Sequence, residues 1–223
     1  MKEHPYLVLL KYECRIIFSS PYKIACAILL TLALPFITGV SNFDFIGRSL
    51  DRTLAIPMII LCSDVYCIEF THYTADNLYC TIRSKMGLIM QRFFLFFTLM
   101  LILSPIVFAM FLWNHPMKPV KGTYLEHILQ AAFAIPCTLF FYGVFSMTVS
   151  NIFKSYWAGL IISISSVVML FGSISDKNEI WSIFSFTYRH PIWPWSKVLY
   201  VVLGIILIYL NKWLVNRSPY EII

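Results

Sequence analysis

This 223-residue sequence contains few charged residues: Asp, Glu, Lys and Arg together make up 13% of the chain, where roughly a quarter is usual for soluble domains. Hydrophobic residues make up 59%, and the mean hydropathy is +0.76. These values exclude a soluble globular domain and indicate a polytopic membrane protein. The formal net charge of +6 does not indicate a nucleic-acid partner, because the basic residues are scattered at the ends of apolar runs rather than gathered on one face.

The sequence also lacks the short motifs that support common chemistries. It has no G-x-x-x-x-G-K-[ST] phosphate loop, so we do not expect it to hydrolyse ATP by itself. It has no HExxH zinc pair and no GxSxG serine nucleophile. The six cysteines form no CxxC pair and mostly fall in apolar runs, where they behave as small hydrophobes. We therefore expect no enzyme activity, and no catalytic, cofactor-binding or metal-binding residues in this chain.

Long apolar runs dominate what remains. A spanning helix needs about 20 apolar residues, because the hydrocarbon layer is about 30 Å thick and each residue rises about 1.5 Å. Six runs approach that length, and we predict an all-α membrane protein with six transmembrane helices in a single domain covering residues 1–223. The predicted spans are residues 22–40, 54–70, 93–113, 128–149, 156–174 and 198–215.

The segments between the runs differ in character. Residues 1–20 place Leu7, Leu10 and Cys14 at helical spacing on one face, which predicts an amphipathic helix in the headgroup layer. The alternative is that this segment is the start of a longer first helix. Residues 41–53 are predicted to be a short polar turn, and residues 175–197 an external loop.

Lysine and arginine counts predict the orientation, since positive residues are retained in the cytoplasm. The N-terminal segment, the connection from 69 to 92, the turn at 151–155 and the C-terminal tail hold ten basic residues, and the opposite set holds seven together with five acids. Both termini and the connection after the second span are therefore predicted to be cytoplasmic, with residues 71–92 forming the main cytoplasmic loop.

Two acids near the end of the second span, Asp64 and Glu69, are notable because a carboxylate inside a bilayer costs several kcal/mol unless it is paired, protonated or hydrated. One interpretation makes Asp64 an intramembrane polar site. The other ends the second helix near residue 63, with both acids in cytoplasmic headgroup water, and requires the helix to begin near Ser49.

The chain has an amphipathic N-terminal segment, six spans, and a cytoplasmic loop in which Glu69 precedes a short predicted helix and then the Ser84-Lys85 pair. This arrangement resembles the ABC-2 type permeases of bacterial ABC exporters. In that family, this loop holds a coupling helix that sits in a groove of a separate ATPase subunit. The resemblance implies coupling contacts for the following residues: Glu69, Asp76, Leu78, Tyr79, Ile82, Arg83 and Lys85.

The resemblance also implies the function and the partners. The chain would be one permease subunit in a bacterial plasma membrane, paired with an identical or related subunit and with ABC ATPase subunits that bind ATP and Mg. The short external loops favour export or extraction of an amphipathic peptide, such as an antimicrobial peptide, or of a lipid-like molecule. Two alternatives remain: an ion-gradient-driven secondary transporter using Asp64 and Glu69, and a non-transporting membrane scaffold.

Overall fold

The structure is a computed structural model that describes residues 21–40, 42–65, 85–113, 117–119, 122–172, 182–188 and 191–216. Within these ranges the regular elements are helices, and one isolated backbone bridge joins Asn42 to Met117. The helices are α2 (Pro21–Thr38), α3 (Phe43–Thr53), α4 (Ala55–Cys62), α7 (Lys85–Trp113), α8 (Tyr124–Phe153), α9 (Tyr156–Gly172) and α10 (Trp193–Asn216). The predicted all-α class is confirmed for this part of the chain.

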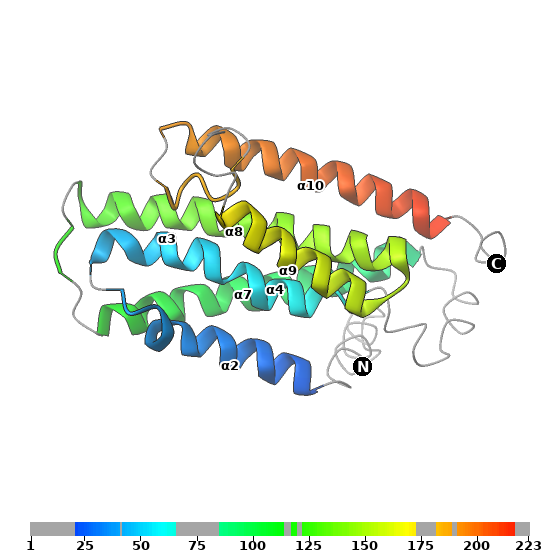
Figure 1. Ribbon diagram of the computed structural model, residues 1–223, viewed down its shortest axis with the longest axis horizontal. Helices are drawn as coiled ribbons and strands as arrows, with labels where there is room; N and C mark the ends of the chain where they lie inside the picture. Colours follow the sequence, from blue (N-terminus) through cyan, green and yellow to red (C-terminus); the bar gives the residue numbers. More distant parts are fainter. Residues whose placement is uncertain are drawn as a thin grey trace, which may run out of the picture.

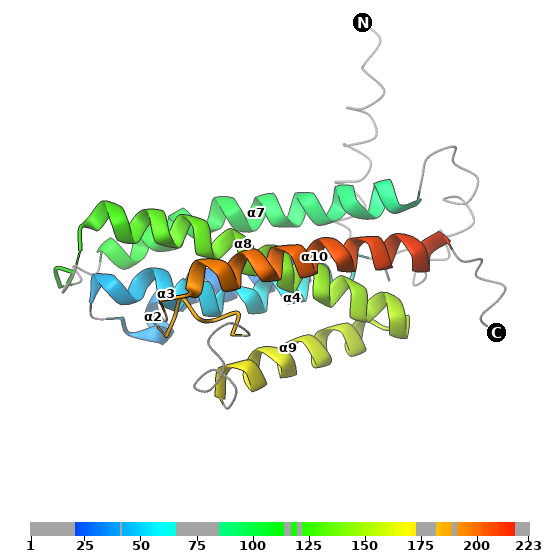
Figure 2. The same cartoon turned by 90° about the horizontal axis from the view of Figure 1, so that it is seen from above.

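The helices lie along one long axis, and the chain reverses direction at each end of the bundle (Figures 1 and 2). We call the end with Pro21, Cys62 and Lys85 the proximal end, and the end with Thr38 and Phe43 the distal end. The turn between α8 and α9 and the last residues of α10 also lie at the proximal end (Figure 1). With α3 and α4 taken as one segment, consecutive segments therefore run antiparallel, as expected for a chain that crosses a bilayer repeatedly.

Among the described residues, four helices are long and apolar enough to cross a membrane: α2, α7, α8 and α10. The third predicted span, residues 93–113, lies within α7, which starts earlier, at Lys85. The fourth, residues 128–149, lies within α8, and the sixth, residues 198–215, within α10. The α9 helix is apolar but has only 17 residues, and the α3 and α4 helices are shorter still.

The prediction of a polar turn at residues 41–53 is wrong, because this stretch forms the α3 helix from Phe43 to Thr53. Its apolar residues Phe43, Ile46 and Leu50 are buried, and their spacing of three and four residues puts them on one face of a helix. The charged residues between them led to the prediction of a turn, yet they occupy the other faces of the same helix.

The α3 and α4 helices are two parts of one rod. The backbone N–H of Leu54 bonds to Leu50 O at 3.0 Å, and that of Met58 bonds to Leu54 O at 3.4 Å, across the boundary. Pro57 has no N–H and cannot donate to the carbonyl of Thr53, which accounts for the irregularity between the two helices.

The rod ends at Cys62, and residues 63–65 form a turn. The predicted second span is thus interrupted after Cys62, residues 66–70 of that prediction lie outside the described residues, and Asp64 lies just after the α4 helix rather than inside it. This agrees with the alternative in which the helix ends near residue 63, although the rod begins at Phe43 rather than near Ser49. Glu69 and the predicted N-terminal helix at residues 1–20 lie outside the described residues.

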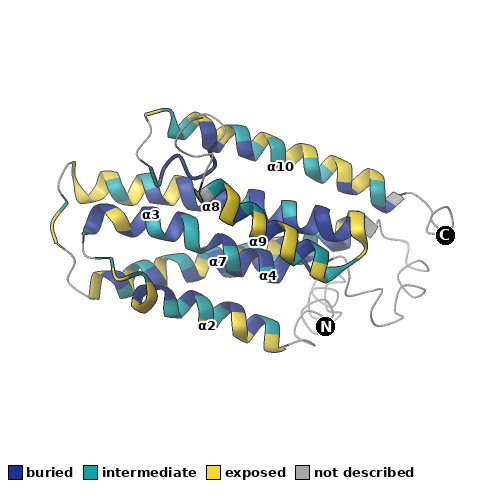
Figure 3. Cartoon of the chain, in the orientation of Figure 1, coloured by how far each residue is buried: buried dark blue, intermediate teal, exposed yellow. Residues whose placement is uncertain are grey.

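The α8 helix is central to the packing: its buried positions run from Ala131 to Asn151, and many positions of α2, α9 and α10 are exposed (Figure 3). At Gly143 a Cβ atom would lie 2.5 Å from Met58 Cε and 2.8 Å from Phe93 Cε2, so α4 and α7 approach α8 closely here. Large exposed hydrophobic side chains cover the outer faces, which suits contact with lipid. They include Leu29, Phe94, Ile102, Ile161, Val202 and Ile206.

Candidate functional site

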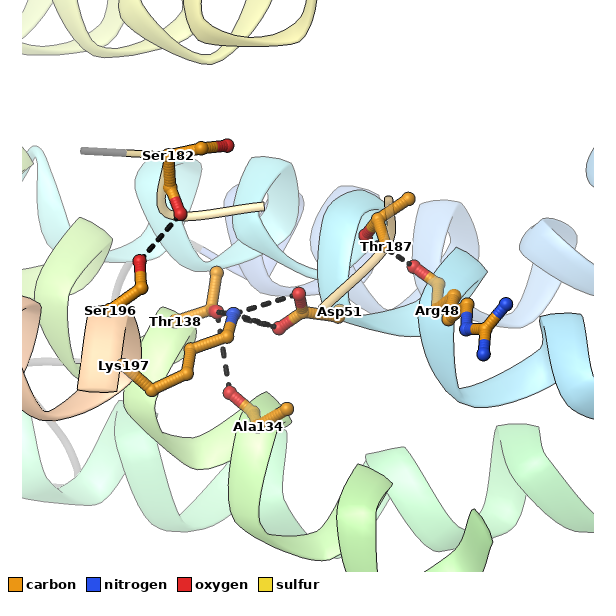
Figure 4. A network of polar contacts seen from close by, with 8 residues as sticks. All are labelled: Arg48, Asp51, Ala134, Thr138, Ser182, Thr187, Ser196 and Lys197. Carbon is orange, nitrogen blue, oxygen red and sulfur yellow. Dashed lines mark hydrogen bonds and ion pairs between the residues drawn. The ribbon is translucent and has the colours of Figure 1, made fainter. Parts of the chain in front are cut away.

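A carboxylate and an ammonium group meet inside the bundle. Lys197 Nζ lies 2.7 Å from Asp51 Oδ1 and 2.8 Å from Asp51 Oδ2. The Thr138 hydroxyl donates to Asp51 Oδ1 at 2.6 Å and accepts from Lys197 Nζ at 2.5 Å (Figure 4). Neither side chain of the ion pair is exposed to solvent. This closed triad, Asp51, Thr138 and Lys197, is the candidate functional site.

Three helices far apart in sequence supply the triad. Asp51 lies on α3, Thr138 on α8 and Lys197 in the second turn of α10. The Asp51 side chain of α3 faces Thr138 of α8 and Lys197 of α10, with which it makes its contacts. Because a charge within a membrane bundle is expensive unless it is paired, a buried ion pair of this kind is a functional-site hypothesis by default.

The segment 182–188 borders both partners of the ion pair. The Ser196 hydroxyl, next to Lys197, donates to Ser182 O at 2.6 Å, and the Thr187 hydroxyl donates to Arg48 O at 3.2 Å, one turn before Asp51 (Figure 4). Phe184 is fully buried and stacks on Tyr142 of α8 with ring centroids 6.0 Å apart. This part of the predicted external loop therefore packs into the bundle.

A second polar cluster joins α8 to α10 nearer the proximal end. Asn151 Nδ2 donates to Asn211 Oδ1 at 2.9 Å, and Asn211 Nδ2 donates to Thr148 Oγ1 at 2.6 Å. All three side chains are buried. The two helices are thus held by polar contacts at two levels, and such hydrogen bonds are a usual means of fixing helix pairs in membranes.

A third pair links the helices at the proximal end. Lys23 of α2 forms an ion pair with Asp64, in the turn that follows α4. The Lys23 ammonium also lies over the ring of Tyr156, the first residue of α9, 4.4 Å from its centroid. Asp64 is therefore a paired group at the end of the rod, with a side chain 12% exposed.

Of the coupling residues that the family resemblance implies, only Lys85 is among the described residues. Lys85 is the first residue of α7, at the proximal end. The remaining coupling candidates lie outside the described residues, and their contacts stay predictions: Glu69, Asp76, Leu78, Tyr79, Ile82 and Arg83. The end of α4 and the start of α7, on either side of this segment, lie at the same end of the bundle as the α8–α9 turn (Figure 1).

The sequence contained a signal for the triad that we interpreted otherwise. Residues 43, 46, 50 and 54 are apolar at helical spacing, which would have placed Asp51 on a helix. Lys197 directly precedes the predicted sixth span. In neither case does the sequence alone say which residue is the partner.

The triad combines a carboxylate, an ammonium group and a hydroxyl. Such a set can hold a buried charge, or one of its members can exchange its partner in the triad for a ligand. In the part of the chain that the structure describes, no group of three or more His, Cys, Asp or Glu side chains is arranged to bind a metal ion. Comparisons with models of protein families, with curated proteins and with solved structures found no match to this chain. The functional proposal therefore depends on the layout and the contacts described above.

Proposed function

We propose that this chain is a transmembrane permease subunit of a transporter driven by a separate ATPase, of the ABC-2 type. It would cross the bacterial plasma membrane six times, with α2, the α3–α4 rod, α7, α8, α9 and α10 as the spans. The four long apolar helices and the lipid-suited outer faces support a membrane location. The rod has helices of 11 and 8 residues joined through Leu54, which brings it close to the length of a span.

The observation that carries the proposal is the linkage made by Lys23 at the proximal end. Its ammonium contacts Asp64, directly before the 66–84 connection, and Tyr156, directly after the α8–α9 turn. In ABC-2 permeases the two corresponding connections are the cytoplasmic ones, and the first holds the coupling helix. A movement of the 66–84 connection would displace Asp64. Because Lys23 belongs to α2 and contacts both Asp64 and Tyr156, the movement would reach α2 and α9 through Lys23.

The distribution of basic residues supports a cytoplasmic proximal end. Lys23, Lys85, Arg92, Lys154 and Lys212 all lie near that end of their helices. Lysine and arginine close to span ends favour retention in the cytoplasm. The ATPase would bind at this end, and its closure on ATP would bias the helices only through contacts that differ between two states of the permease.

The experiment is to co-purify the chain with a candidate ATPase and to replace Leu78 or Ile82 by Asp. We expect loss of the complex and of its ATP turnover, because an apolar contact in a partner groove tolerates a buried charge poorly. Asn77→Asp adds the same charge beside Leu78 and serves as the matched control. A complex that binds and turns over ATP equally well with Leu78→Asp and Ile82→Asp would refute the coupling role.

The cargo under this proposal is an amphipathic peptide or a lipid-like molecule, exported or extracted from the bilayer. The distal connections support this, because four residues separate α2 from α3, ten separate α7 from α8 and 20 separate α9 from α10. Such connections are too short to form a folded domain that would capture a soluble substrate.

A second candidate function is a transporter driven by an ion gradient, and the Asp51–Lys197 pair favours it. Intramembrane carboxylates commonly mark proton and ion pathways. From the sequence, this alternative uses Asp64 and Glu69. Asp64 lies at the end of the rod and Glu69 outside the described residues, whereas Asp51 is inside the bundle. Transport that stops with an uncoupler or with Asp51→Asn, but continues when ATP is depleted, would favour this candidate over the first.

A further inference from the structure

Residues 182–188 lie inside the bundle although they form no helix. The segment consists of turns, and Ile183, Phe184 and Ser185 are completely buried. Non-helical backbone at membrane depth is tolerated only where it is buried in protein or lines a water-filled cavity. The segment is therefore an insertion held by the surrounding helices rather than a loop on the surface.

The two ends of the segment lie on the distal side of the triad. The α3 and α10 helices both run from the distal toward the proximal end (Figure 1). Thr187 donates to the carbonyl of Arg48, three residues before the triad carboxylate on α3. Ser196, one residue before the triad ammonium group on α10, donates to the carbonyl of Ser182 (Figure 4). The segment therefore crosses both helices directly above their charged residues.

The middle of the segment reaches deeper than the triad. The Phe184 ring stacks on Tyr142 with centroids 6.0 Å apart, and Tyr142 follows Thr138 by one turn of α8 toward the proximal end. Phe184 belongs to a buried apolar cluster that also contains Ala55 and Ile59 of α4 and residues of α8, α9 and α10. An aromatic side chain from a connection between helices thus fills the space beside the triad.

The segment leaves two of its own polar groups unsatisfied in this position. The hydroxyl oxygens of Ser182 and Ser185 are buried and have no hydrogen-bond partner among the described residues. Buried hydroxyls are normally paired, because an unpaired one has lost its bonds to water without replacement. Moving the segment into water would restore those bonds, so part of the cost of leaving the bundle is offset.

The contacts at the ends of the segment can be exchanged with water. The sequence SIFSFTY contains no charged residue. The two hydrogen bonds to the carbonyls of Arg48 and Ser182 each come from a hydroxyl group, and water can replace either partner. Burial of the apolar side chains of Ile183, Phe184 and Phe186 opposes withdrawal.

We propose that residues 182–188 form a displaceable plug, which closes the triad from the distal side when it is seated and opens it to water on that side when it withdraws. In the seated position, described above, neither Asp51 nor Lys197 is exposed to solvent. Withdrawal removes Phe184 from the space beside them, so that a hydrated ion or ligand can reach the charged pair. The plug goes beyond the proposed permease function and does not depend on whether an ATPase drives the chain.

Thiol labelling tests the plug in the full-length chain, held in phosphatidylcholine nanodiscs so that both faces are accessible. The native cysteines are replaced first, and a charged methanethiosulfonate then modifies Ser185→Cys only while the plug is withdrawn. We expect complete modification, about 100-fold slower than that of Lys118→Cys, which is exposed. Adding Phe184→Ala should raise the rate about tenfold, because burial of the ring stabilises only the seated position. Mass spectrometry measures the modified fraction over time.

Two controls separate withdrawal of the plug from loosening of the whole bundle. Phe111→Ala removes a buried ring of α7 and should leave the rate at Ser185→Cys unchanged. Cysteine in place of Ser163, a buried residue of α9, should stay unmodified with or without Phe184→Ala. If Phe184→Ala does not fold, as judged by circular dichroism, Ser196→Ala replaces it, since loss of its hydrogen bond to the plug should also speed the modification.

Three outcomes would overturn the proposal. Modification of Ser185→Cys as fast as that of Lys118→Cys would show that the segment is not seated. No modification, or a rate that neither Phe184→Ala nor Ser196→Ala changes, would make the segment a fixed part of the core. An equal acceleration at the α9 cysteine would show that the whole bundle opens. No ATPase is present in this measurement, so failure of the co-purification experiment would leave its result unchanged.

Discussion

Lys197 and Asp51 are 146 positions apart in sequence, and their charged atoms are 2.7 Å apart in a place that solvent does not reach. The pair fixes the start of α10 against α3, with the Thr138 hydroxyl between them. Burying an ion pair in such surroundings costs free energy. Removing only one of its two residues costs more, because the remaining charge is then buried without a partner.

Single substitutions at the pair should therefore destabilise the bundle. We expect Asp51→Asn or Lys197→Met to lower the free energy of unfolding by about 3–5 kcal/mol. The apolar double variant Asp51→Leu/Lys197→Met should recover most of that loss, since it leaves no unpaired charge. Unfolding in mixed detergent, followed by circular dichroism, measures all three. Additive losses in the double variant would show that the two residues do not act as a pair.

The asparagine cluster between α8 and α10 should contribute less. Asn211→Leu removes bonds to Asn151 and Thr148 and should lower the free energy of unfolding by about 0.6 kcal/mol, the average for polar contacts between membrane helices, and by no more than about 1.7 kcal/mol, their maximum. The same unfolding measurement applies. Lys212→Gln changes the exposed neighbouring residue and should leave the free energy of unfolding unchanged. An equal decrease with Lys212→Gln would show that any substitution in this part of α10 is destabilising, whether or not it removes the hydrogen bonds of the cluster.

Close helix packing at Gly143 gives a third test. The Cβ of Gly143→Ala would lie within 3 Å of Met58 Cε and Phe93 Cε2, and we expect a destabilisation of about 1–3 kcal/mol from overpacking. Ala132→Val adds two methyl groups on the same helix at an exposed position and is the control. If Gly143→Ala is as stable as the unmodified chain, α4 and α7 are further from α8 than described.

Lys23 provides a test of transmission that is separate from docking. If the chain is a permease subunit as proposed, Lys23→Gln should still co-purify with the candidate ATPase but lose most of the cargo-dependent change in ATP turnover, because contacts with both Asp64 and Tyr156 are lost. Lys154→Gln removes an exposed charge at the same end and should change neither. Unaltered turnover with Lys23→Gln would exclude this route of coupling.

The orientation of the chain can be tested with single cysteines. Cysteine in place of Lys118, between α7 and α8, should react with a membrane-impermeant maleimide in intact cells, and cysteine in place of Lys154 should react only after the cells are opened. The six native cysteines are replaced by Ser or Ala first. The reverse labelling pattern would place the proximal end outside and remove the basis for an ATPase there.

The sequence predicted the long helices well because each is an apolar run that needs no partner to be recognised. The α7, α8 and α10 helices all enclose the spans expected for them, and the residues added at their ends are mostly those that flank apolar runs. Length and hydropathy decide the existence of such helices, whereas their exact ends depend on local capping and on contacts with neighbours.

The triad could not be predicted in the same way. Asp51 and Arg52 interrupt an apolar pattern, and charged residues between spans are normally assigned to loops. Only packing against α7 and α8, together with the ion pair to Lys197 of α10, makes α3 a buried helix. Residues 182–188 pose the same problem, because the burial of Ser182 and Ser185 depends on the space left by other helices. Pairings between distant segments are tertiary information that a single sequence does not express.

The missing N–H of Pro57 has a mechanical consequence for the rod. One backbone hydrogen bond is absent between its charged half, α3, and its apolar half, α4, so the rod can bend there at less cost than in a continuous helix. The charged half is clamped to α8 and α10 by the triad, while the end of the apolar half is clamped to α2 by Lys23 and Asp64. We therefore expect the rod to bend at Leu54. Displacement of one end of the bundle should change the angle between α3 and α4 before either ion pair breaks.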